Sequence, residues 1–181
     1  MGIKQFNGSY IPIEDRVKFR FNSEEDNEYP LWLTRRVTLF ILAATEHLVE
    51  KRLEQKHNKP AAKAIAKFNH DTIKERANFD EEYIPASQFP LGTDPVLVMD
   101  VKCVMIQIDR QDVFSLDLIL PDGADLNLKL SVPMMEVMRL LLERLAVQGN
   151  WGHLPLNVPE QNSPAQNEMT PSFSKEKKNF H

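Results

Sequence analysis

Leu31–Phe40, LWLTRRVTLF, contains the point where a strand pattern gives way to a helix pattern. Before Thr34, Leu31 and Leu33 would lie on one side of an extended chain and Trp32 on the other. After Thr34, apolar residues recur at helical spacing, and threonine is a favoured helix N-cap because its hydroxyl accepts a hydrogen bond from a free backbone N–H. This stretch therefore predicts a strand that leads directly into a helix.

A second strand is predicted just before this one. Residues 16–21, RVKFRF, alternate between basic and apolar side chains, which is typical of a half-buried strand. The polar, acidic residues that follow indicate a turn, so the two strands are expected to form a hairpin. Further along, residues 113–120 and 126–130 alternate in the same way, and Ser131 is predicted to cap a helix that ends at Gly149.

These two sets of elements match when the sequence is shifted by 97 residues. Phe19 then falls on Leu116 and Leu31 falls on Leu128, while one N-cap residue falls on the other. The sequence thus predicts two strand–loop–strand–helix units, at residues 15–57 and 112–149. One such unit buries too little apolar surface to fold alone, so the two are expected to share a core. The aligned pairs are Val17 with Phe114, Phe19 with Leu116, Phe21 with Leu118, Tyr29 with Leu126, Leu31 with Leu128, Leu33 with Leu130, Thr34 with Ser131, Glu46 with Glu143 and Leu48 with Leu145.

The rest of the chain completes a predicted α+β fold, in which an antiparallel sheet of about five strands has helices packed on one face. Residues 96–108, VLVMDVKCVMIQI, are rich in β-branched side chains with little sign of a solvent face, and are expected to form a central strand. Residues 1–14 are predicted to be an irregular lead-in to a single domain at 15–152. Trp151 is expected to pack back on this domain. Residues 153–181 are rich in Pro, Asn, Gln and Ser, which predicts a disordered tail.

The composition of the chain excludes only a few kinds of site and location. The chain has 181 residues, a formal net charge of −4 and one cysteine, Cys103. A single cysteine allows neither an internal disulfide nor a cysteine-based zinc site, which favours a reducing, cytoplasmic location. The start of the sequence lacks the apolar core of a signal peptide, and the longest apolar runs are too short or too charged to span a membrane.

Arg35 and Arg36 lie in the first turn of the predicted helix, where the positive end of the helix dipole disfavours cations. Three interpretations stay open. The side chains can reach outward to the acidic turn at residues 24–28, or bind a phosphate or carboxylate together with the free N–H groups of the helix start. They can also surround a protein interface that includes Trp32.

Residues 51–76 form the only locally basic segment. Its second half is predicted to be a helix whose polar face carries Lys63, Lys67, Lys74 and Arg76. Such a face is usually solvated, but lysines at helical spacing can also neutralise phosphates of a nucleic acid. Together with Arg35 and Arg36, this helix defines an alternative function as a nucleic-acid or anion-binding regulatory protein.

No arrangement of residues predicts catalysis, a metal or a cofactor. His47, His57 and His70 lack the four-residue spacing of a helical metal site, and Cys103 falls inside a predicted buried strand. His70, next to Asp71 with Glu75 a turn away, lacks a nucleophile. We therefore expect a non-enzymatic protein-binding or adaptor module, either bound to a protein partner or as a homodimer, because apolar runs such as residues 37–44 and 137–142 require a thick core or a partner.

Overall fold

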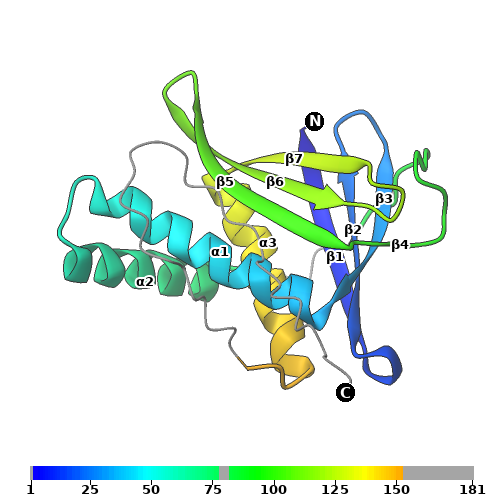
Figure 1. Cartoon of the computed structure of the whole chain (residues 1–181), viewed down its shortest axis with the longest axis horizontal. Coiled ribbons are helices and arrows are strands. Elements are labelled where there is room, and N and C mark those ends of the chain that lie inside the picture. Colours follow the sequence, from blue (N-terminus) through cyan, green and yellow to red (C-terminus); the bar gives the residue numbers. More distant parts are fainter. Residues whose placement is uncertain (1, 78–81, 153–181) are drawn as a thin grey trace, which may run out of the picture.

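The computed structural model describes residues 2–77 and 82–152, so the predicted tail at 153–181 lies outside the described part of the chain. The fold is α+β, as predicted, with three α-helices and two β-sheets in this part (Figure 1). The first sheet contains β1 (Ile3–Ile11), β2 (Arg16–Ser23), β3 (Glu28–Thr34) and β4 (Val96–Leu97), in that order. The second contains β5 (Asp100–Ile108), β6 (Gln111–Ile119) and β7 (Asp125–Ser131). The helices are α1 (Arg35–Glu54), α2 (Lys59–Arg76) and α3 (Val132–Gln148), and a short 3-10 turn, η1, spans Pro12–Glu14.

The prediction of one five-stranded sheet is wrong, because the expected central strand at 96–108 divides between two sheets. Val98 N–H donates to Trp32 O of the first sheet at 2.9 Å, whereas Met99 N–H donates to Ile119 O of the second at 2.8 Å. The chain therefore crosses from one sheet to the other between these two residues. β5 then lies at the edge of its sheet rather than at its centre. An apolar, β-branched run is compatible with either arrangement.

The prediction of an irregular lead-in at residues 1–14 is also wrong, because this segment contains β1 and η1. β1 pairs antiparallel with β2 along its whole length. Its apolar pattern is weak because Gly8 lies where α3 crosses the strand. A Cβ atom at Gly8 would lie 2.8 Å from Cδ1 of Leu145, so the missing side chain is what lets the helix approach.

Each predicted unit is preceded in the structure by a further strand, and we count β1 and β5 as the first strands of the two units, which then have the same element order. β1–β2–β3–α1 corresponds to β5–β6–β7–α3, and the bounds of β1 and β5 differ by the same shift of 97 residues as those of β3 and β7. Both predicted helix caps are confirmed. Thr34 Oγ1 accepts from Val37 N–H at 3.3 Å, and Ser131 Oγ accepts from Met134 N–H at 3.4 Å. The match of the two stretches at one shift of 97 residues is an interpretation in favour of duplication of one unit, and that common origin stays a prediction.

α1 and α3 each pack on strands of both units. α1 contacts β3 and β5, while α3 contacts β1 as well as β6 and β7, so buried side chains from both units form one apolar cluster. Trp151 closes this core as predicted. It is 1% exposed, its Nε1 donates to Asp15 Oδ1 at 2.6 Å, and its ring meets Tyr10 edge-on.

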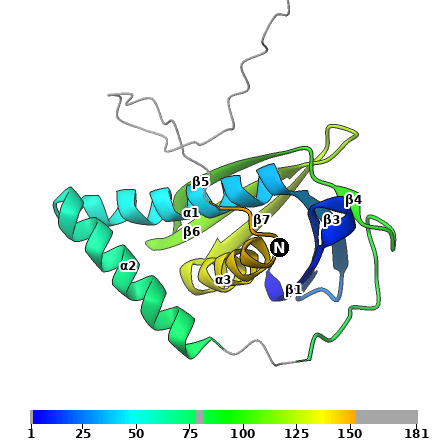
Figure 2. The same cartoon turned by 90° about the horizontal axis from the view of Figure 1, so that it is seen from below.

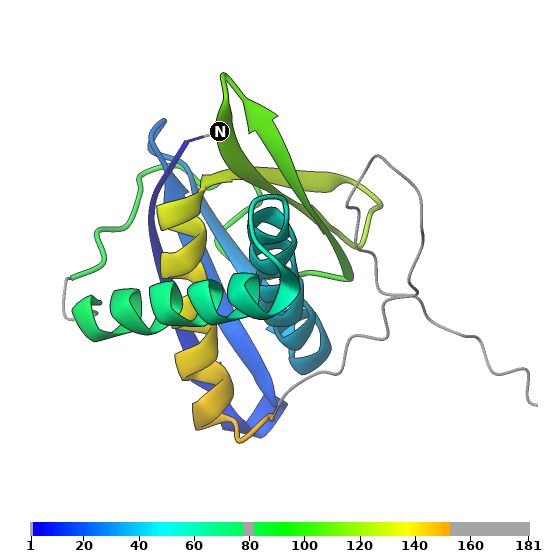
Figure 3. The ribbon, with the colours of Figure 1, turned by 90° about the vertical axis from the view of Figure 1, so that its left-hand side faces the viewer.

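α2 lies outside this arrangement as a third layer. It crosses α1 and α3 on the side away from the sheets, and in Figure 3 it is the element nearest the viewer. Only Ala62 and Ala66 of its 18 residues are buried. A helix with so little buried surface is held in position by few contacts. The side of α2 that faces away from α1 and α3 is exposed to solvent.

Candidate functional site

The residues predicted to bind an anion or a partner lie where β3 joins α1. Arg36 Nη2 donates to Met99 O at 2.6 Å, and its Nη1 lies 3.9 Å from Asp100 Oδ1. The guanidinium of Arg16 lies 4.0 Å above the centre of the Trp32 ring, a cation–π contact. Arg35 is exposed. Arg36 and Trp32 therefore already have partners within the chain, at the place where it passes between the sheets.

The acidic turn suggested as a partner for the arginines lies at the opposite end of β3, about 20 Å away along a strand of seven residues. Pairing of Arg36 with that turn is therefore wrong. Asp100, close in space but 64 positions further along the sequence, takes that place for Arg36.

The basic residues predicted on the second helix are all exposed. Lys63, Lys67, Lys74 and Arg76 lie on α2, which begins after Asn58, whose Oδ1 accepts from Ala61 N–H at 3.0 Å. α2 follows the C-terminal end of α1, whereas the arginine pair begins α1 (Figure 2). The structure therefore does not bring the two predicted sets of basic residues together.

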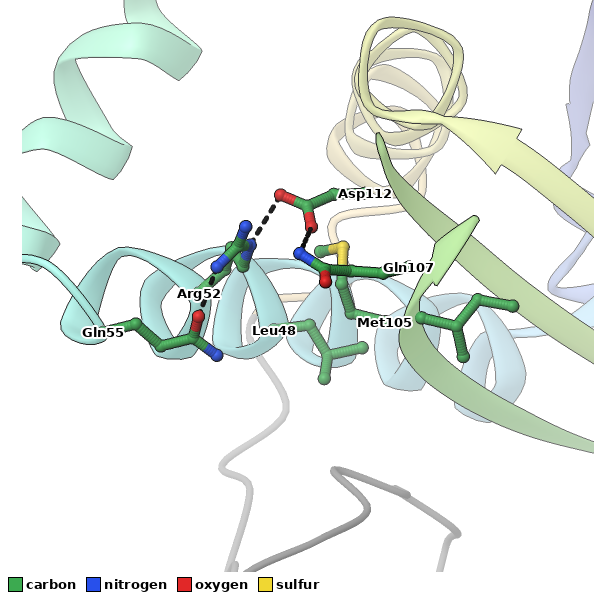
Figure 4. A pocket seen from close by; sticks show the side chains of 7 residues that line it. Leu48, Arg52, Gln55, Met105, Gln107 and Asp112 are labelled. Carbon is green, nitrogen blue, oxygen red and sulfur yellow. Dashed lines mark hydrogen bonds and ion pairs between the residues drawn. The ribbon is translucent and has the colours of Figure 1, made fainter. Parts of the chain in front are cut away.

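A small polar pocket of about 140 Å³ lies between α1 and the β5–β6 hairpin. Figure 4 shows Arg52 between Gln55 and Asp112, with Gln107 on the other side of the carboxylate. Arg52 Nε donates to Asp112 Oδ2 at 2.5 Å, and Gln107 Nε2 donates to Asp112 Oδ1 at 3.2 Å. The hydrogen bond from Arg52 is the main reason that the pKa of the Asp112 carboxyl is lowered. The polar side chains that line the pocket form hydrogen bonds with one another, and these bonds connect α1 to the β5–β6 hairpin.

A second polar cluster joins α2 to α3. His70 Nδ1 lies 3.1 Å from Glu136 Oε2, and its Nε2 lies 2.9 Å from Glu143 Oε2. Arg139 Nε donates to Glu143 Oε1 at 3.0 Å, and its Nη1 lies 3.9 Å from Glu136 Oε1. Glu136 and Arg139 are buried. The sequence drew attention to His70, but its partners are on α3 rather than at the adjacent acidic positions of α2.

Next to this cluster an open groove of about 280 Å³ runs between α2 and the neighbouring helices. We call it the α2 groove. Phe68 forms one side and is 70% exposed, Val132 also faces solvent, and Glu136 reaches the groove from the buried cluster. The lining is mostly apolar, which is the composition of a surface that contacts another apolar group. Its lining residues are Val49, Ala66, Phe68, Asn69, Thr72, Ile73, Val132 and Glu136.

The groups that could support catalysis are dispersed or buried. Cys103 is completely buried in β5, and burial raises the pKa of its thiol, so it is not a nucleophile. In residues 2–77 and 82–152, no three His, Cys, Asp or Glu side chains are arranged to hold a metal ion. Within the same residues, no helix combines the length and apolar character needed to cross a membrane.

The α2 groove and the exposed side of α2 together combine an apolar groove with an exposed aromatic side chain. Sequence reasoning missed the groove because its residues come from three helices, and their packing partners are not evident from periodicity. Comparisons with known proteins give no further indication, since no family model, no curated protein and no solved structure matches this chain.

Proposed function

We propose that the protein is a non-enzymatic protein-binding module that contacts its partner through α2. The observation that supports this most directly is Phe68, a large aromatic side chain that is 70% exposed at the edge of the α2 groove. Full burial of such a side chain is worth about 1.5–3 kcal/mol, most of which is forgone in the isolated chain. A partner that covers α2 would recover it.

The packing of α2 supports the same proposal. Helices gain most of their stability from burial of an apolar face, yet only Ala62 and Ala66 of α2 are buried, and its packing on α1 is supplemented by the His70 cluster. Exposed aromatic side chains that lie beside a groove are typical anchors of protein interfaces. We call the exposed side of α2 its outer face, defined by Lys63, Ala64, Lys67, Phe68, Asp71 and Glu75, all of which face solvent.

Site-specific photo-crosslinking in cells tests this function. A photoreactive amino acid at Ala64 should form discrete protein adducts, and Phe68→Ser should abolish them because the aromatic anchor is removed. Ile13→Ser is the matched control, since Ile13 is 96% exposed on η1 and its loss should leave the adducts unchanged. Absence of adducts, or adducts that persist in Phe68→Ser, would refute the proposal.

Nucleic-acid binding is the second candidate, and the exposed lysines of α2 favour it. It requires an affinity that falls steeply with salt, because each neutralised phosphate releases counterions. Binding of a nucleic acid that is lost in Lys63→Glu/Lys67→Glu, but kept in Phe68→Ser, would replace protein binding as the function of α2.

A further inference from the structure

His70 is the residue through which α2 is attached to α3. Its side chain is 11% exposed, and its two ring nitrogens lie 3.1 Å from Glu136 Oε2 and 2.9 Å from Glu143 Oε2. Among the described residues, no other side chain of α2 forms a hydrogen bond to another helix. Since only Ala62 and Ala66 of α2 are buried, the loss of one of these two contacts should weaken the attachment of α2 to α3.

This pair of contacts requires a proton. A neutral imidazole has one N–H group, so one ring nitrogen can donate to a carboxylate while the lone pair of the other nitrogen faces the second carboxylate. Two lone pairs at this distance repel each other, so a further proton must lie between them. Because imidazole is a stronger base than a carboxylate, the proton resides on His70, and the imidazolium then donates from both nitrogens.

The charged groups around His70 leave it as the member of the cluster whose charge changes near neutral pH. On α3, Glu136 and Glu143 each face His70 with one oxygen and Arg139 with the other, and a guanidinium keeps its proton at any ordinary pH. The charged side chains that neighbour Val49 on α1 and His70 on α2 form no hydrogen bond or ion pair with His70, and these are Glu46, Arg52, Lys67, Asp71 and Lys74.

His47 of α1 would produce a pH effect of the opposite sign. Burial lowers the pKa of the His47 imidazole, so its protonation destabilises the fold as the pH falls. A contact that is lost as the pH rises is therefore not explained by His47.

We propose that the proton on His70 holds α2 against α3 and thereby regulates the α2 groove. This inference rests on the proposed function and states how the same site is controlled. The groove has residues of α2, such as Phe68, on one side and Val132 and Glu136 of α3 on the other, so it loses one side when α2 moves away from α3. Attachment of α2 takes up a proton. The contact is therefore complete in mildly acidic solution and is lost as the pH rises through the titration of His70.

Hydrogen exchange of the full chain between about pH 5 and 8, the range in which histidine changes its charge, tests the proposal. After correction for the intrinsic effect of pH on exchange, the protection of amides in Lys59–Arg76 should fall as the pH rises, by up to about tenfold per pH unit, because one proton is linked to the attachment of α2. His70→Gln should leave α2 with weak protection that no longer depends on pH. His57→Gln, which removes an exposed histidine between α1 and α2, is the matched control and should behave as wild type.

Glu143→Gln separates control by a proton from a purely structural role of the cluster. The new amide N–H can donate to the unprotonated imidazole nitrogen, while the amide carbonyl still accepts from Arg139 Nε. Attachment of α2 then needs no proton, so at about pH 8 α2 should keep the protection that it has in wild type at about pH 5. If the cluster had only a structural role, this substitution would weaken α2 at every pH.

Protection of α2 that is the same throughout this pH range in wild type, or that still falls with pH in Glu143→Gln, would overturn the proposal. The crosslinks from Ala64 keep this result separate from the proposed function. Adducts that depend on Phe68, together with pH-independent protection, would leave the proposed function standing without control by His70. Absence of adducts, together with pH-dependent protection, would refute the proposed function, and His70 would then control only the position of α2.

Discussion

At the scale of single residues, His70 shows how a polar side chain can hold two helices together. Both of its ring nitrogens face carboxylates, and only the protonated imidazolium can donate a hydrogen bond at both. Arg139 contacts the same two carboxylates from α3 itself. Buried charges are tolerated when they are paired and hydrogen-bonded in this way. The cluster therefore anchors α2, which has little apolar contact of its own.

Removal of one cation from this cluster should destabilise the fold. Arg139→Met keeps much of the side-chain volume but removes the guanidinium that contacts Glu136 and Glu143. We expect a loss of about 3 kcal/mol in the free energy of unfolding, measured with urea. Lys129→Met removes an exposed cation of β7 outside this cluster, so it is the control and should change stability by less than about 0.5 kcal/mol. Equal effects of the two substitutions would contradict a structural role for the cluster.

The Arg52–Asp112 pair should contribute to stability in a pH-dependent way. The pKa of Asp112 is lowered below its ordinary value of 3.8, chiefly by the hydrogen bond from Arg52. A lowered folded-state pKa means that the contribution is present above 3.8 and is lost as the pH falls through the folded-state value. Asp112→Asn should therefore cost roughly 1 kcal/mol at neutral pH, and this difference should vanish in strong acid.

Unfolding curves at several pH values would measure this difference. Asp109→Asn is a suitable control, since Asp109 is exposed in the same hairpin turn and asparagine tolerates its positive φ of 50°. It should match wild type at every pH. A cost for Asp112→Asn that stays constant in acid would show that the charge of the pair is not the cause.

These residue pairs could hardly be predicted from sequence. His70 was noticed, but Asp71 and Glu75, its neighbours in sequence, are exposed, and its actual partners lie more than sixty positions away. Arg52 and Asp112 are separated by 60 positions, and no sequence pattern indicates that they pair. Local periodicity specifies which side of a helix is apolar, whereas contacts between helices depend on how those sides meet.

At the scale of elements, prediction succeeded where local chemistry is strong. Thr34 and Ser131 begin their helices as expected, because a hydroxyl at the N-cap satisfies a free backbone N–H irrespective of distant contacts. It failed at β1, where Gly8 interrupts the apolar pattern, and between Val98 and Met99, where one run of apolar residues serves two sheets. Both failures concern positions whose role is set by another element.

Gly8 provides a test of that dependence at the crossing of β1 and α3. Gly8→Val adds a branched side chain whose Cβ alone would lie 2.8 Å from Leu145 Cδ1, so the buried Leu145 side chain or α3 itself must shift. We expect a loss of about 1–3 kcal/mol in stability, measured by thermal or urea unfolding. Ser9→Val, on the exposed side of the same strand, is the control and should be neutral or slightly stabilising. A stable Gly8→Val protein would show that α3 does not need this close approach.

At the scale of the whole molecule, the two units complete each other. α1 belongs to the first unit but packs on β5 of the second, and α3 belongs to the second but packs on β1 of the first. β4 adds a further contact to the first unit. It follows that unit in sequence and pairs parallel to β3 before the chain enters the second sheet. Neither unit alone has a helix and a sheet that bury each other fully, so folding of each should require the other.

A split chain tests this interdependence. Gly92 and Thr93 are exposed in the connection between the units, and Gly92 has no other atom within 4 Å of the position its Cβ would take, so a break between them removes few contacts. We expect the fragments 1–92 and 93–181 each to be largely unfolded by circular dichroism and to fold when mixed, because only together do they form the shared core. A break between Gly123 and Ala124, in the exposed turn of one hairpin within the second unit, gives a matched control that divides the chain without separating α1 from β5. A cooperative melting transition of the fragment 1–92 alone would show that the first unit has its own core. The packing of α1 on β5 would then be a contact between two independently folded domains.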